Sequence, residues 1–235
     1  MKKYWKHIRL VLLVILLIGL MSFANYRHSH KHLAQVDVEV FPFESLFITE
    51  GEVQKQILLD EFNKLKLNEI TLNNFEHQLV THDMIKQAQV YYSIDGILGI
   101  EVIQRRPILR FIDGGSHYLD EDGEIMPLSK NYAARVPVAF GFTSANIKDV
   151  FPLLKAIEKD QFLSQHVIGL TNQNNGLYLS LREAKFEVVF GEINEIELKL
   201  KNLKAFYAKA KKEDKLAAYK QVDLRFGNQV VCTKI

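Results

Sequence analysis

The chain has 235 residues, of which 48% are hydrophobic and 11% aromatic, and its formal net charge at pH 7 is +2. This composition is sufficient for one large or two small folded domains, and the nearly balanced charge argues against nucleic acid as a partner. Cys232 is the single cysteine, which excludes an internal disulfide framework.

The first long apolar run, residues 10–26, has no charged residue between Arg9 and Arg27. It reaches about the 17–20 residues that a helix needs to cross a membrane. A cleaved signal peptide is the alternative, but Ser22-Phe23-Ala24 is a poor match to a small-x-small cleavage site. We therefore expect an uncleaved anchor. The basic residues before the run predict the following order: cytoplasmic tail 1–9, transmembrane helix 10–26, juxtamembrane linker 27–33.

Three alternating histidines, His28, His30 and His32, follow the apolar run. Histidines on one face of a strand can bind a metal ion, but no Cys, Asp or Glu stands beside them to complete a closed site. We interpret them as a polar collar, with metal binding as the alternative.

A first folded unit is predicted over residues 34–108. Alternation predicts a strand at 36–40, and Thr49 with Glu52 forms a capping box that starts a helix over about 50–63. A second cap at Asn73 with Glu76 starts a short helix that ends near Thr81. Period-two patterns then predict strands on both sides of the Asp95-Gly96 turn. The predicted element order is β-α-α-β-β.

This order resembles the polypeptide-transport-associated (POTRA) domain of the FtsQ/DivIB family of bacterial cell-division proteins. The return strand runs into Gln104-Arg105-Arg106-Pro107. The motif keeps the Arg and Pro with which the family ends this strand, but it lacks the usual acid.

Residues 109–235 are predicted to form a mostly antiparallel β-domain with flanking helices, so the expected fold class is α+β. The acidic stretch 118–127 predicts a hairpin turn rather than a calcium loop, because Gly123 comes before the sixth position counted from Asp120 and no Glu stands at the twelfth. An amphipathic helix is predicted from the spacing of Val150, Leu153, Leu154 and Ile157, with Pro152 tolerated in its first turn. Strands are expected at about 167–170, 177–183 and 185–190. The first pair of these strands is joined at Asn174-Asn175-Gly176.

A Lys-rich helix is predicted after Gly191. Its apolar stripe indicates packing against the sheet, because two heptads are too few to predict a coiled coil. Gly191 and Lys199-Leu200 resemble the family's strand-Gly-helix passage. The stripe consists of Ile193, Ile196, Leu200, Leu203 and Tyr207.

The closing segment, residues 219–231, resembles the family's final strand. With a two-residue turn at Gly227-Asn228, position 226 would pair with 229, 224 with 231, and 222 with 233. Val230 and Cys232 would then share the polar face with Asp223 and Arg225, in an edge strand that could accept a partner strand. The expected partner-binding residues are Asp223, Arg225, Phe226, Val230 and Cys232.

No catalytic constellation is recognisable in the sequence. Phosphate loops, nucleophile elbows, zinc-protease motifs and paired cysteines are absent from it. We therefore predict no enzyme activity, no catalytic or metal-binding residues and no cofactor. The histidines of the predicted folded part stand in dissimilar contexts: His77, His82, His117 and His166.

The resemblance implies a non-enzymatic divisome scaffold in the inner membrane, with its bulk in the periplasm and its place at the division septum. It implies recruitment of FtsB- and FtsL-type partners by β-strand addition, contacts with other division proteins through the POTRA domain, and control of septal peptidoglycan synthesis. One alternative is a POTRA-bearing translocation or outer-membrane assembly factor, although residues after 108 are too few for an ordinary barrel. The other is a membrane-anchored envelope enzyme.

Overall fold

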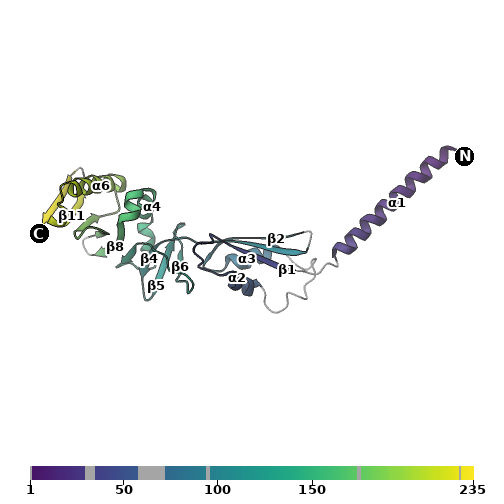
Figure 1. Ribbon diagram of the computed structural model, residues 1–235, viewed down its shortest axis with the longest axis horizontal. Coiled ribbons are helices and arrows are strands. Elements are labelled where there is room, and N and C mark those ends of the chain that lie inside the picture. The colour runs from purple at the N-terminus through teal and green to yellow at the C-terminus, as the bar shows by residue number, and fades with distance from the viewer. Residues whose placement is uncertain (1, 30–34, 58–71, 94–95, 174–175, 228) are drawn as a thin grey trace. The chain divides into compact units, whose positions relative to one another are not determined.

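The computed structural model describes residues 2–29, 35–57, 72–93, 96–173, 176–227 and 229–235 (Figure 1). Within 2–29 it describes side chains only for 9–23 and 26. The chain divides into two compact units, residues 1–104 and 105–235. The histidine collar and the turn residues Asp95, Asn174, Asn175 and Asn228 lie outside the described side chains, as do residues 58–63 of the first predicted helix.

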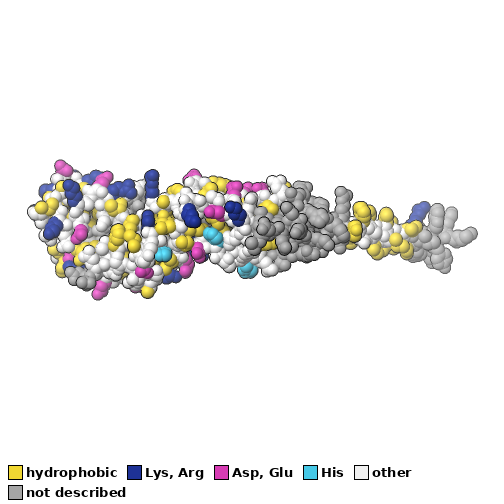
Figure 2. Space-filling model, turned by 90° about the horizontal axis from the view of Figure 1, so that it is seen from below, with side chains coloured by type: hydrophobic (Ala, Val, Ile, Leu, Met, Phe, Trp, Pro, Cys, Tyr) yellow, Lys and Arg dark blue, Asp and Glu magenta, His cyan; other side chains and the backbone are white. Residues whose placement is uncertain are grey.

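The N-terminal helix α1 spans Lys2–Ser29, and its described apolar side chains are exposed (Figure 2). Among the described residues, no helix is long and apolar enough to cross a membrane. The predicted transmembrane helix at 10–26 is therefore wrong. The uncharged run falls short of the ~20 predominantly apolar residues that a typical bilayer requires, and Ser22 and Asn25 make its last turns polar.

In the first unit, β1 (Gln35–Phe41), α2 (Glu50–Ile57), α3 (Leu72–Val80), β2 (Ile85–Tyr92) and β3 (Ile97–Gln104) follow in order. The sheet order is β1-β3-β2, with β1 parallel and β2 antiparallel to β3. Alternate strand residues such as Val40, Val90 and Val102 are buried together with Val53 of α2 and Leu79 of α3. One face of the sheet therefore contributes to the core of this unit.

The two predicted helix caps have different outcomes. The Thr49 amide donates to Glu52 Oε2 at 2.8 Å and the Glu52 amide donates to Thr49 Oγ1 at 3.3 Å, which confirms the capping box. The cap at Asn73 is wrong, because α3 already includes Leu72. Glu76 instead accepts a 2.8 Å hydrogen bond from the Val90 amide of β2.

Gln104 is the last residue of β3, at the strand end where the family motif usually carries an acid. It is 3% exposed, and its Oε1 accepts from the Phe47 amide at 2.7 Å. Its Nε2 donates to the carbonyls of Pro42 and Ser45 at 3.1 and 2.7 Å. An ionised carboxylate could only accept, so the amide serves both kinds of partner in this loop.

The second unit is built on a sheet of nine strands in the order β12-β11-β10-β9-β8-β7-β4-β5-β6. In chain order they are β4 (Pro107–Ile112), β5 (Ser116–Asp120), β6 (Ile125–Pro127), β7 (Val138–Phe140), β8 (Val167–Gln173), β9 (Gly176–Leu181), β10 (Glu187–Gly191), β11 (Tyr219–Phe226) and β12 (Gln229–Lys234). The helices are η3 (Ile147–Val150), α4 (Phe151–Lys159), α5 (Gln161–His166), α6 (Ile196–Lys212) and η4 (Leu216–Ala218).

This sheet is mixed: five of the eight pairs of described strands are antiparallel, in keeping with the predicted mostly antiparallel β-domain, and three are parallel. Strands β4 and β7, β7 and β8, and β10 and β11 pair in parallel. The helices α4 and α5 lie between β7 and β8 in the chain, and α6 lies between β10 and β11. Such helical crossovers return the chain in the same direction and so produce parallel neighbours.

Helices α4, α5 and α6 cover the core of the second unit. The predicted stripes hold: Leu153 and Ile157 of α4 and Leu200, Leu203 and Tyr207 of α6 are buried in one cluster with strand residues. Pro152 lies in the first turn of α4, where a missing N–H is tolerated. The α6 stripe therefore packs within this unit, as predicted.

Candidate partner-binding edge of the C-terminal sheet

The last strand, β12, lies at one end of the nine-strand order and pairs only with β11 among the described strands. The N–H and C=O groups on its other side are therefore open to an additional strand. This edge is the candidate functional site.

The pairing of β11 with β12 differs from the predicted register. Cys232 lies opposite Val222 and Val231 lies opposite Asp223, whereas only the pair of Phe226 with Gln229 was predicted correctly. A register shift between Asp223 and Phe226 causes the difference by placing an extra residue in β11, and a second shift of the same kind lies between Tyr219 and Gln221. A bulge of this kind moves the partner residues by one position, and therefore to the other face of the sheet.

The shifted register changes which side chains can meet a partner. Val230 and Cys232 pack against the hydrophobic core, so their predicted place on the polar face is wrong. Burial also raises the pKa of the Cys232 thiol. Val231 is 45% exposed and Phe226 is 55% exposed. The accessible apolar groups of this hairpin are thus Phe226 and Val231, and the sequence pattern missed Val231.

One hydrogen bond at the end of β12 shows which of its backbone groups face β11 and which face the open edge. The Ile235 amide donates to the Ala218 carbonyl at 3.1 Å, so residue 235 faces β11. Backbone direction alternates along an antiparallel strand, and β12 itself has no inserted residue. The N–H and C=O groups of Val230, Cys232 and Lys234 therefore point to the open edge.

Arg225 and Asp223 form a fixed ion pair on β11. Arg225 Nε lies 3.0 and 3.1 Å from the two Asp223 oxygens, and Nη2 lies 2.6 Å from Oδ2. The Arg225 amide also donates to Asp223 Oδ1 at 3.0 Å. Burial by itself raises the pKa of the Asp223 carboxyl, but the hydrogen bonds from Arg225 outweigh it and hold the pKa below its ordinary value. Asp223 therefore holds the Arg225 side chain in place.

Gly191 on β10 makes room for the Arg225 side chain. Its φ is +75°, and a Cβ there would lie 2.6 Å from Arg225 Cγ and 2.9 Å from Cδ. A glycine is thus required both by the backbone conformation and by the neighbouring stem. The guanidinium remains partly open, since the Arg225 side chain is 45% exposed.

Lys199 supports the loop that follows Gly191. It is 3% exposed, and its Nζ donates to the Glu192 carbonyl at 2.8 Å and to Asn194 Oδ1 at 2.6 Å. Its ammonium also lies 4.8 Å from the centre of the Phe190 ring. Burial lowers the pKa of Lys199. The sequence showed this lysine only as part of a family-like passage, because a buried lysine in a Lys-rich helix has no distinctive local pattern.

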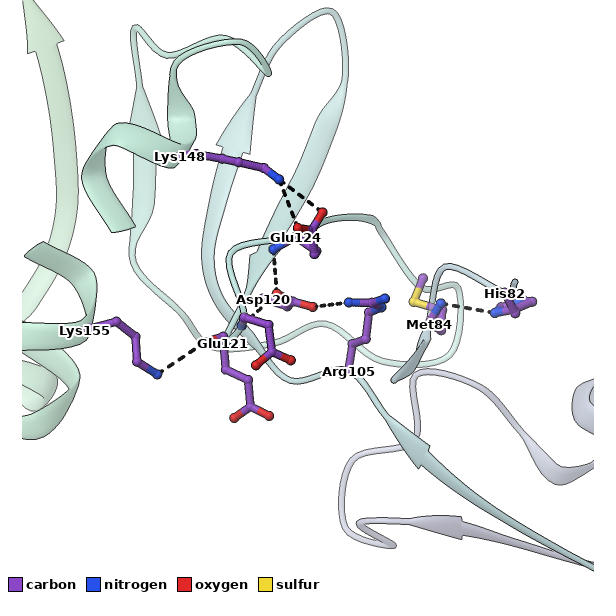
Figure 3. A network of polar contacts seen from close by, with 9 residues as sticks. His82, Met84, Arg105, Asp120, Glu121, Glu124, Lys148 and Lys155 are labelled. Atoms are coloured by element: carbon purple, nitrogen blue, oxygen red, sulfur yellow. Dashed lines mark hydrogen bonds and ion pairs between the residues drawn. The ribbon is translucent and has the colours of Figure 1, made fainter. Parts of the chain in front are cut away.

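The acidic turn after β5 is used inside the second unit (Figure 3). Asp120 is buried, and its Oδ1 accepts from the amides of Asp122 and Glu124 at 2.9 and 2.7 Å. Arg105 Nη1 donates to Asp120 Oδ2 at 2.7 Å. Strands β5 and β6 pair in antiparallel fashion on either side of this turn, which confirms the predicted hairpin.

The described histidines do not gather into a site. His82 Nδ1 accepts from the Met84 amide at 3.2 Å, and His166 Nδ1 lies 2.8 Å from the Phe162 carbonyl. Within the described residues, no group of three or more His, Cys, Asp or Glu side chains could hold a metal ion.

Fold and edge together define an α+β protein whose C-terminal unit presents a strand with one open edge. Residues 106–233 match the family described as FtsQ/DivIB, C-terminal related. Because this match covers more than half of the chain, the protein belongs to that family, and the family resemblance predicted from the motifs is confirmed. The family is a division scaffold family, which supports a role in cell division. A search of curated proteins finds no match to this chain.

Proposed function

We propose that the protein is a non-enzymatic division scaffold that recruits FtsB- and FtsL-type partners by adding a partner strand to β12. Through these partners it would help to control septal peptidoglycan synthesis, and it would act at the division septum. The observation that supports this proposal is the open edge of β12, where three successive outward positions offer backbone donors and acceptors. In strand addition, main-chain bonds give affinity and side chains give selectivity.

The side chains around this edge suit an acidic and partly apolar strand. Arg225 is partly open and is held in place by Asp223 and Gly191. Phe226 and Val231 offer exposed apolar surface. A partner carboxylate would meet a cation that is already oriented, so little side-chain entropy is lost on binding.

Lys234 offers a test of the backbone contribution. Its N–H points to the open edge and its side chain is exposed, so Lys234→Pro removes an outward donor and leaves the bonds to β11 intact. Lys234→Ala removes the same side chain but keeps the donor. With the soluble part of an FtsB-type protein in calorimetric titration, we expect the proline variant to bind about tenfold more weakly than the alanine variant.

Equal affinity of these two variants, with unchanged circular dichroism, would contradict strand addition at β12. A tagged copy in living cells tests the wider proposal, because a division scaffold should form a midcell band. A uniform envelope signal would argue for a different process.

The first unit is proposed to be the POTRA domain that contacts other division proteins. Its β1-α2-α3-β2-β3 order is the feature that supports this assignment. Deleting residues 34–104 should displace the protein from midcell while the second unit still binds the FtsB-type partner. Midcell localisation of the truncated protein would show that localisation depends on another part of the chain.

A further inference from the structure

A groove of about 400 Å³ lies between α4 and α6, apart from the β12 edge. The two helices lie side by side in the second unit (Figure 1). The floor of the groove is aliphatic and consists of Ala156, Leu163, Ile196 and Leu200. Leu163 and Leu200 are buried, whereas Ala156 and Ile196 are only partly buried. The groove thus exposes part of an apolar floor to solvent.

Lysines form both walls of this groove. Lys155 and Lys159 are four residues apart on α4, and Lys201 and Lys204 are three apart on α6. Helical periodicity places residues at these spacings on one face. The two helices therefore turn a pair of cations each toward the same groove.

Two of these four cations are already neutralised. Lys155 Nζ lies 2.8 Å from Glu158 Oε2, and Lys204 pairs with Asp160. Lys159 and Lys201 are exposed and have no acidic partner among the described residues. Glu197 is the other acid of the lining. Lysines outnumber acids in the lining, so the groove favours an anionic occupant.

The floor decides what kind of anion fits. Methyl groups at the floor cannot bind the hydroxyls of a wall glycan or replace the water around a bare phosphate. They can bury leucine-like anchors of a helix, and the lysines can then meet carboxylates beside those anchors. A third helix laid over α4 and α6 would satisfy both features at once.

We infer that this groove binds an acidic amphipathic helix of a partner protein, at a surface separate from β12. The apolar anchors of that helix rest on Ala156 and Ile196, and its carboxylates face Lys159 and Lys201. The inference does not depend on strand addition, because none of these residues belongs to β11 or β12.

The experiment uses the full chain and a labelled helical peptide of about 15 residues, with leucines at i, i+3, i+4 and i+7 and flanking glutamates. Fluorescence anisotropy should show saturable binding, and a peptide with lysines in place of the glutamates should not bind. Lys159→Glu combined with Lys201→Glu should weaken binding at least tenfold. The matched control, Lys185→Glu with Lys209→Glu, changes the charge equally at exposed positions outside the groove and should change binding less than twofold.

Ala156→Phe fills the floor without changing a charge and should also abolish binding while circular dichroism is unchanged. Equal weakening by the groove and control variants would overturn the inference, because binding would then follow net charge. Absence of peptide binding, preferential binding to phosphatidylglycerol vesicles, or self-association that the groove variant abolishes would overturn it as well.

Discussion

Gly191→Ala tests whether Arg225 is fixed by the packing seen on β10 and β11. The substitution adds a Cβ at a residue with φ +75°, 2.6 Å from Arg225 Cγ and 2.9 Å from Cδ. Arg225 cannot easily withdraw, because Asp223 holds its guanidinium through both oxygens. We therefore expect a loss of stability together with weaker partner binding.

The loss of stability expected for Gly191→Ala has two separable parts. Left-handed backbone costs a non-glycine residue about 1–2 kcal/mol, and forcing an extra carbon against a packed stem costs about 1–3 kcal/mol. In an Arg225→Ala background the second part disappears, because the new Cβ would lie 3.9 Å from the Cβ of residue 225. Gly191→Ala should then cost only about 1–2 kcal/mol.

The assay is a double-mutant cycle in urea, followed by circular dichroism. Hydrogen exchange of peptides from β10 and β11 identifies the transition of the second unit, since the chain has two units. A coupling energy of about 1–3 kcal/mol between the two substitutions is expected. An equal cost of Gly191→Ala in both backgrounds would refute the packing argument and leave only the backbone effect.

Three further predictions concern the edge and the first unit. The pKa of Asp223 is lowered in the folded protein, so its contribution to stability is complete above its unfolded pKa of about 3.9 and is lost as pH falls through the folded value. In urea unfolding measured from pH 6 downward, the free energy of unfolding of Asp223→Asn should therefore fall less steeply below about pH 3.9 than that of the unsubstituted protein. Val231→Lys should keep the fold and weaken FtsB-type binding about tenfold, because Val231 is exposed. Val230→Lys should instead lower the unfolding midpoint, because Val230 packs on the core. The reverse pattern would show that the core and solvent faces of β12 are misassigned. Gln104→Leu should cost about 2–4 kcal/mol by removing the hydrogen-bond partner of the buried Phe47 amide and of the partly buried Pro42 and Ser45 carbonyls, and an unchanged midpoint would contradict that role.

The sequence determined those features that depend on neighbouring residues. The capping box at Thr49 and Glu52 closes within one helical turn, so its residue types alone predict it. The stripes of α4 and α6 follow from helical period, and the acidic turn at Asp120 follows from its glycine and its spacing. The order of short motifs also gave the family, which the match over residues 106–233 confirms.

The N-terminal run shows where composition misled. Residues 10–26 predicted a transmembrane helix from their lack of charge, yet no described helix meets the requirements for crossing a membrane. A run near the minimum length is decided by a few polar residues at its ends. Charge counting gives those residues too little weight.

Only the tertiary structure decided the faces of the final hairpin. Alternation predicts which residues share a face only while a strand is uninterrupted, and the extra residues in β11 break that rule for β12. The side chains of Val230 and Cys232 therefore turn to the core and Val231 turns outward, although all three are apolar. Lys199 is buried because Phe190, Glu192 and Asn194, at the end of β10 and in the loop before α6, close around its side chain, an arrangement that helical period does not reveal. Contacts between distant segments leave no local period in the sequence, and for this reason alternation could not predict which side chains of β12 face the core.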